Sequence, residues 1–65
     1  VKDYKGALSD FTMAIDLNPQ DAKAYYGSGY SKILLDKTES GCADVQKSKE
    51  MGYAQDQAVL NQYCK

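Results

Sequence analysis

The chain has 65 residues, of which 26% are charged and 43% are apolar, and its formal net charge is −1. This size suits one small domain, and the slight negative charge argues against attraction to the phosphate backbone of a nucleic acid. The chain has no histidine, the commonest acid–base residue and metal ligand, and no run of about 18 apolar residues that would predict a membrane-spanning helix.

A first helix is predicted between Tyr4 and Ile15, because apolar and small residues recur there at positions 4, 7, 8, 11, 14 and 15. Pro19 ends it, since the residue before a proline avoids helical backbone angles. Leaving several large apolar side chains in water loses on the order of several kcal/mol. We therefore expect the exposed face of this helix to be covered by a longer chain or to self-associate. That face consists of Tyr4, Leu8, Phe11 and Ile15.

A second helix is predicted over residues 22 to about 35, with Asp21 as its N-cap. Residues 36–38 form a polar turn in this interpretation. Thr38 is the expected N-cap of a third helix, which runs to about Met51.

Gly52 fits the left-handed backbone position that follows many helices, and a fourth helix is expected over about 54–63. No segment alternates between apolar and polar residues with period two, so no strands are expected. Connections of a few residues make neighbouring helices antiparallel. The predicted fold is therefore all-α, with about four antiparallel helices.

An internal repeat is visible when the chain is shifted by 34 residues, which places the third helix over the first. Small residues then fall on small residues, and apolar residues on apolar residues. The pairs are Ala7 with Gly41, Asp10 with Asp44, Phe11 with Val45, Ala14 with Ser48, Leu17 with Met51 and Pro19 with Tyr53. A period of 34 residues built from pairs of helices is the signature of tetratricopeptide repeats (TPR).

Residues 4–19 resemble the second helix of a TPR unit. The family pattern there is an aromatic residue, an alanine, a phenylalanine four residues later, a further small residue and a closing proline. The matching residues are Tyr4, Ala7, Phe11, Ala14 and Pro19. The resemblance implies that 1–21 is the second half of a unit, and that the chain starts in the middle of that unit.

Residues 22–55 resemble one complete but degenerate unit. Gly29 matches the family strictly, whereas Tyr25, Ser28 and Lys32 replace its tryptophan, leucine and tyrosine. In the second half, the replacements are Gly41, Val45, Ser48 and Tyr53. Such drift is expected of a terminal repeat. Residues 56–65, in a helix from about 54, then resemble the C-terminal capping helix of a TPR array.

Two glycines predict close packing between helices. Gly29 lies in the middle of the second helix, where glycine costs about 1 kcal/mol relative to alanine. A close approach to the next helix, near Gly41, is the simplest reason for its presence.

The resemblance also implies a peptide-binding groove, because the first helix of each TPR unit lines the concave surface of the array. The groove candidates are Lys23, Tyr26, Tyr30, Ile33 and Leu34. Tyrosine suits such a surface, since it combines a large contact area with a polar tip. Alternatively, these side chains only pack against a missing neighbour or the capping helix.

Cys42 and Cys64 lie about equally far from the reversal at Gly52, so two antiparallel helices would bring them level. A disulfide is then geometrically feasible, and would place the protein in the periplasm or outside the cell. Two reduced thiols are the alternative and would fit the cytoplasm. Zinc is not expected, because two cysteines without histidine supply too few ligands.

No catalytic or cofactor-binding residues are predicted. The acidic residues form no acid–base pair, and no phosphate-binding loop or activated nucleophile is recognisable. Asp44, with the charged residues of 47–50, is expected to form a solvated helix face.

The predicted function is therefore that of a protein–protein interaction scaffold, not an enzyme. Two alternatives remain: a purely structural cap at the end of a longer repeat array, and a non-catalytic domain attached to an enzyme. The Gly-Cys and Tyr-Cys pairs resemble terminal segments of bacterial TPR chains, which implies a bacterial source.

Overall fold

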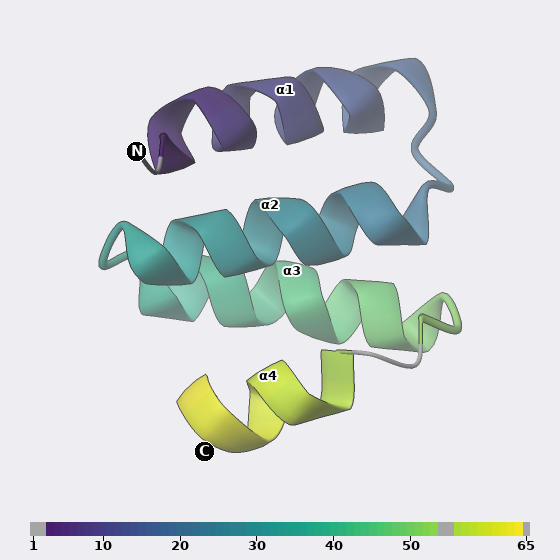
Figure 1. Cartoon of the computed structure of the whole chain (residues 1–65). Helices are drawn as coiled ribbons and strands as arrows, with labels where there is room; N and C mark the ends of the chain where they lie inside the picture. The colour runs from purple at the N-terminus through teal and green to yellow at the C-terminus, as the bar shows by residue number, and fades with distance from the viewer. Residues whose placement is uncertain (1–2, 54–55, 65) are drawn as a thin grey trace.

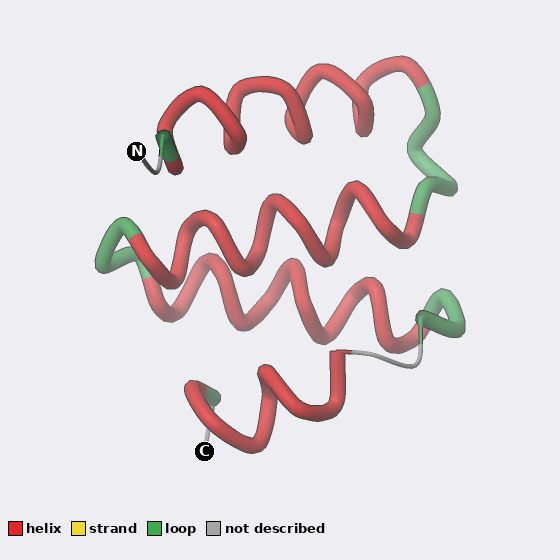
Figure 2. The backbone as a smooth tube through the Cα atoms, in the orientation of Figure 1, coloured by secondary structure: helices red, strands yellow, loops and turns green. Residues whose placement is uncertain are grey.

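A computed structural model of the chain describes residues 3–53 and 56–64, and within these ranges every regular element is an α-helix. The helices are α1 (Tyr4–Leu17), α2 (Ala22–Leu34), α3 (Thr38–Glu50) and α4 (Asp56–Tyr63). Consecutive helices run antiparallel in one stack, and the turns alternate between its two ends (Figure 1, Figure 2). The all-α prediction is thus confirmed. The expected start of the fourth helix near residue 54 lies outside the described residues.

Aspartate side chains cap the first two helices. Asp3 accepts a hydrogen bond from the backbone N–H of Gly6 at 2.9 Å, and Asp21 accepts one from the N–H of Ala24 at 3.1 Å. These bonds satisfy N–H groups that have no partner inside the helix. Asn18, which precedes Pro19, has extended backbone angles, so α1 ends where the proline predicts.

The expected N-cap role of Thr38 is wrong, because Thr38 is already the first helical residue and Lys37 occupies the cap position without a side-chain bond. The cause is a tight reversal at Asp36, whose φ of 65° lies in the left-handed region. Its N–H donates to the carbonyl of Ile33, and the N–H of Lys37 donates to that of Lys32 at 2.8 Å. This pair of bonds is the Schellman arrangement, which ends α2. The connection to α3 is therefore short, and α3 already begins at Thr38.

The same arrangement ends α3, this time with glycine at the left-handed position. Gly52 has a φ of 100°, and the N–H of Tyr53 donates to the carbonyl of Ser48 at 3.1 Å. The prediction for Gly52 is confirmed.

A close contact between helix backbones joins Gly29 of α2 to Gly41 of α3. A Cβ atom added to either glycine would lie 2.5 Å from the carbonyl oxygen of the other. Both residues are buried. The predicted close approach is confirmed, since no side chain larger than hydrogen fits on either side of this contact.

The hydrophobic core lies where α2, α3 and α4 meet. Its buried members are Ile33, Val45 and Val59, one from each helix. The Cys42–Cys64 disulfide joins α3 to α4 beside this cluster, with 5.8 Å between the two Cα atoms. The sequence leaves two alternatives open, a disulfide and two reduced thiols, and the structure contains the disulfide.

α1 packs on α2 through Phe11, whose ring lies directly over Gly27. Phe11 thus contacts its neighbour in the stack and does not lie on a fully exposed face. Coverage of the remaining face by a longer chain or a second copy stays a prediction. The large hydrophobic residues of α1 that are exposed are Met13, at 60%, and Leu17, at 82%. None of the described helices is long and apolar enough to cross a membrane.

Candidate functional site

A pocket of about 340 Å³ opens between α1, α2 and the turn that follows α3. Its walls are mostly aromatic or apolar, and among its nine lining residues Lys23 alone carries a charge. The lining residues are Tyr4, Ala7, Phe11, Lys23, Tyr26, Gly27, Tyr30, Ser31 and Tyr53. Such a cavity suits an apolar side chain rather than a polar metabolite.

Four tyrosine rings form a continuous row in which each ring contacts the next. The Tyr26 and Tyr53 centroids are 5.0 Å apart, those of Tyr26 and Tyr30 are 6.3 Å apart, and those of Tyr30 and Tyr63 are 6.2 Å apart. These spacings are those of favourable aromatic pairs. Tyr26 and Tyr30 thus each pack against two other rings of the row.

Tyr63 stands at the end of the row and belongs to α4. Loss of contact with water raises the pKa of its phenol above the usual value of 10.0, and the neighbouring Tyr30 raises it further. The phenol is therefore neutral at physiological pH.

Three of the five groove candidates lie together, and the other two lie elsewhere. Lys23, Tyr26 and Tyr30 line the pocket. Ile33 is buried in the core, and Leu34 is half-buried and does not line the pocket. Their common role in peptide binding stays a prediction.

Sequence reasoning missed part of the pocket wall. From the sequence, Tyr4 and Phe11 are expected on a face of the first helix that a longer chain or a second copy covers. Ala7 is only a match to the repeat pattern there, and Tyr53 only a replacement for proline. The internal repeat contains a signal for Tyr53. It places this residue at the position of Pro19, in a turn next to the following helix.

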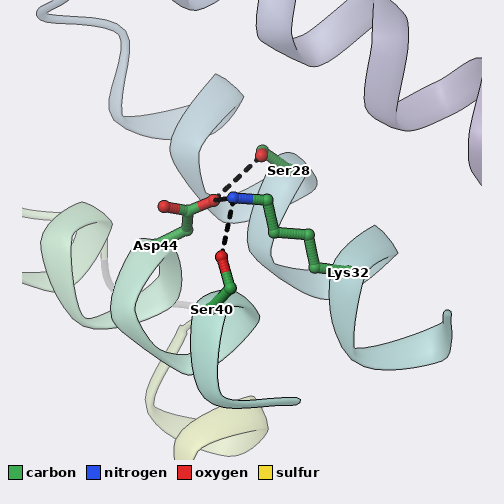
Figure 3. A network of polar contacts seen from close by, with 4 residues as sticks. All are labelled: Ser28, Lys32, Ser40 and Asp44. Atoms are coloured by element: carbon green, nitrogen blue, oxygen red, sulfur yellow. Dashed lines mark hydrogen bonds and ion pairs between the residues drawn. The ribbon is translucent and has the colours of Figure 1, made fainter. Parts of the chain in front are cut away.

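A second cluster, made of polar side chains, joins α2 to α3 (Figure 3). Lys32 forms an ion pair with Asp44 at 2.9 Å, and its ammonium group donates to the hydroxyl of Ser40 at 3.0 Å. The hydroxyl of Ser28 donates to the same carboxylate of Asp44 at 3.0 Å. None of the four residues lines the pocket, so the cluster orients the two helices and does not form part of the site.

The expectation that Asp44 lies on a solvated helix face is wrong, because its carboxylate contacts Lys32 and Ser28 of α2. Its side chain is 20% exposed and faces α2, although the charged residues that follow it, at 47, 49 and 50, are exposed. Asp44 lies one turn after the buried face of Gly41, and this places it at the edge of the α2–α3 contact.

Replacing Asp44 with alanine is expected to lower the free energy of unfolding by about 1–3 kcal/mol. The change leaves the hydroxyl of Ser28, which is 2% exposed, without its acceptor. Urea denaturation followed by circular dichroism measures the loss. Glu50→Ala, at an exposed position of the same helix, is the control and should change stability by less than about 0.5 kcal/mol. Equal effects of the two substitutions would contradict the assigned role of the cluster.

The described residues contain no group of three or more side chains that could hold a metal ion. The arrangement offers instead a pre-formed apolar recess with one cationic group, Lys23, on its wall. Chemically, it can bury an aliphatic or aromatic side chain and attract a neighbouring carboxylate.

Comparison with other proteins gives a local similarity. No known protein family matches the chain, and no solved structure matches it either. Over 38 residues, 58% of its length, the chain is 47% identical to the mitochondrial import receptor subunit TOM70 of Homo sapiens. The matching region is 6% of the length of that receptor subunit. In part of its sequence, the chain is thus similar to a receptor subunit of the mitochondrial import system.

Proposed function

We propose that the chain is a protein-interaction module of the TPR type, and that it belongs to a larger repeat array. Three observations support this: the 34-residue internal repeat, the stack of four antiparallel helices, and the local similarity to the import receptor subunit TOM70. The units would be residues 1–21, 22–55 and 56–65, as the repeat predicts. A bacterial source stays a prediction.

The proposed binding site for a partner is the pocket between α1 and α2. It is mainly apolar, and its tyrosines Tyr26 and Tyr30 pack against other rings. Packed aromatic walls favour binding, because little side-chain entropy remains to be lost. We assign the pocket to an apolar side chain of a protein or peptide, with Lys23 attracting an acidic neighbour.

The proposed module has no catalytic role. Its binding surface is an aromatic recess, and the polar cluster of Ser28, Lys32, Ser40 and Asp44 is occupied in joining two helices. The Cys42–Cys64 bond supports an exported protein, in the periplasm if the source is bacterial, because such bonds persist in oxidising compartments.

Replacing Tyr30 with alanine is expected to weaken partner binding at least about 10-fold, as is usual for a central aromatic residue of an interface. Tyr30 is 37% exposed, so its loss should leave the fold intact. Peptides are first selected from a random phage-displayed library on the intact chain. The dissociation constants of the selected peptides are then compared between the chain and its variants by fluorescence anisotropy.

Leu17→Ala is the matched control, since Leu17 is a large exposed apolar residue that does not line the pocket. It should leave binding unchanged. A library that yields no peptide sensitive to Tyr30→Ala would contradict the proposed site. It would favour a cap that only ends an array, or a passive domain attached to an enzyme.

A further inference from the structure

Helix α4 lies at the end of the described stack, against α3, and little of its own sequence holds it there (Figure 1). It has eight residues, and an isolated helix of this length is at most marginal in water. Val59 is buried in the core, and Leu60 and Tyr63 pack beside it. This burial has to offset the conformational entropy of eight residues, and the two quantities are close in size. The covalent bond from Cys64 to Cys42 therefore decides whether α4 stays in place.

Helices α2 and α3 are held together by contacts that lie outside α4. Gly29 meets Gly41 backbone to backbone, and Lys32 forms its ion pair with Asp44 at 2.9 Å. The turn at Gly52 ends α3 with hydrogen bonds to the carbonyl groups of α3 itself. Since none of these contacts involves α4, the α2–α3 pair can keep its arrangement when α4 leaves.

The bond that fastens α4 lies within reach of a thiol. Cys64 follows Tyr63, the last residue of α4, and both Cys42 and Cys64 are half-buried, not enclosed. The thiolate of a dithiol attacks one sulfur and forms a mixed disulfide, which the second thiol of the same molecule then displaces. Two electrons and two protons thus pass from the dithiol to the chain, the dithiol becomes a disulfide, and the reverse exchange restores the bond.

Release of α4 has a consequence at the pocket, because α4 supplies one ring of the tyrosine row. Tyr63 meets Tyr30 edge to face, with 6.2 Å between the ring centroids. Tyr63 directly precedes Cys64, and its carbonyl oxygen lies 4.0 Å from Sγ of Cys42, so the bond anchors this residue closely. Tyr30 lines the pocket and otherwise packs against Tyr26. The loss of Tyr63 therefore removes one of the two rings that support Tyr30.

We propose that the Cys42–Cys64 bond is a redox switch that seats or releases α4. In the oxidised chain, α4 is folded on α3 and Tyr63 supports Tyr30. In the reduced chain, α4 leaves the stack and unfolds, α2 and α3 stay paired, and the pocket binds its partner more weakly. Without the bond, the ratio of released to seated α4 rises about 100-fold, as loop-closure entropy gives. The effect on the partner rests on the interaction role proposed above.

The first test compares the intact ¹³C,¹⁵N-labelled chain in oxidised and in reduced dithiothreitol. The Cα chemical shifts report whether each residue is helical. On reduction, the shift of Leu60 should move to its unfolded value, whereas those of Gly41 and Asp44 should stay helical. Reoxidation should restore the helical shift of Leu60. The variant Cys42→Ala, Cys64→Ala is the control, and should resemble the reduced chain in both buffers.

The second test measures the peptides selected on the oxidised chain. Reduction should weaken their binding about 2- to 10-fold, the range that the free energy of one aromatic pair gives. Tyr63→Ala removes the ring and keeps the bond, so it should weaken binding to a similar extent in the oxidised chain, with Leu60 still helical. Tyr63→Phe keeps the ring and is the matched control, which should bind as the native chain does.

Three results would overturn the inference. If Leu60 stays helical after reduction, packing alone holds α4. If Gly41 and Asp44 lose their helical shifts together with Leu60, the bond supports the whole fold and switches no single helix. If α4 is released and binding stays the same, α4 does not act on Tyr30. In each case, peptides that remain sensitive to Tyr30→Ala in the oxidised chain would leave the proposed function standing, and insensitive peptides would contradict that function separately.

Discussion

The substitution Gly29→Leu is expected to unfold the chain at 25 °C. Even the first carbon of the new side chain would lie 2.5 Å from the carbonyl oxygen of Gly41, and 2.6 and 2.9 Å from atoms of Val45. Two of these three atoms belong to the backbone of α3, so no rotamer change removes the overlap. Separating α2 from α3 opens the core at Ile33 and Val45. A loss of about 3 kcal/mol or more follows, comparable with the whole stability of a domain this small.

Thermal and urea melts followed by circular dichroism measure the effect of Gly29→Leu. Gln46→Leu introduces the same side chain at an exposed position of α3 and should change stability by less than about 0.5 kcal/mol. Gly29→Ala should fall between the two, because its gain in helix propensity of about 1 kcal/mol opposes the overlap. A Gly29→Leu variant as stable as the control would show that the two helices are not held at glycine–glycine distance.

Removing the Cys42–Cys64 bond is expected to give the second-largest loss of stability. The bond closes a loop between residues 22 positions apart, and loop-closure entropy alone gives a value of roughly 3 kcal/mol. For a domain of this size, the midpoint of thermal unfolding should fall by about 10–20 °C. α4 should be affected most, because it has only eight residues and contributes one buried side chain, Val59, to the described core.

The double variant Cys42→Ala, Cys64→Ala is compared with the native chain by calorimetry, with and without a phosphine reductant. The reductant should lower the midpoint of the native chain and leave that of the variant unchanged. If reduction moves the native midpoint by less than about 2 °C, packing alone holds α4 on α3.

The helices and their antiparallel order could be predicted because they depend on local signals. The apolar stripe of α1, the cap at Asp21, the break at Pro19 and the glycine at position 52 each act within a few residues. The wrong prediction of Thr38 as an N-cap also arises from a local signal. The left-handed position that ends α2 is held by Asp36 instead of glycine, so the usual signal for a tight reversal is missing there.

The candidate site could be predicted only in part, because helical spacing gives the direction of a side chain but not the neighbour that covers it. Tyr26 and Ile33 are seven residues apart and point in nearly the same direction from α2. The end near Tyr26 opens towards α1, whereas the end near Ile33 is covered by α3 and α4. The pairing of Lys32 with Asp44 likewise depends on how two helices are placed against each other.

The uneven burial along the stack implies an uneven order of melting. None of the residues Tyr4–Leu17, all of which the structure describes, is fully buried, whereas α2 and α3 share the core and a disulfide fastens α3 to α4. Opening α1 therefore costs less free energy than unfolding the rest, and α1 should detach as a separate cooperative unit. Because one wall of the pocket belongs to α1, each such opening abolishes the pocket while the remaining three helices stay folded. A partner seated there would close this fluctuation, so its affinity would contain the free energy of ordering α1.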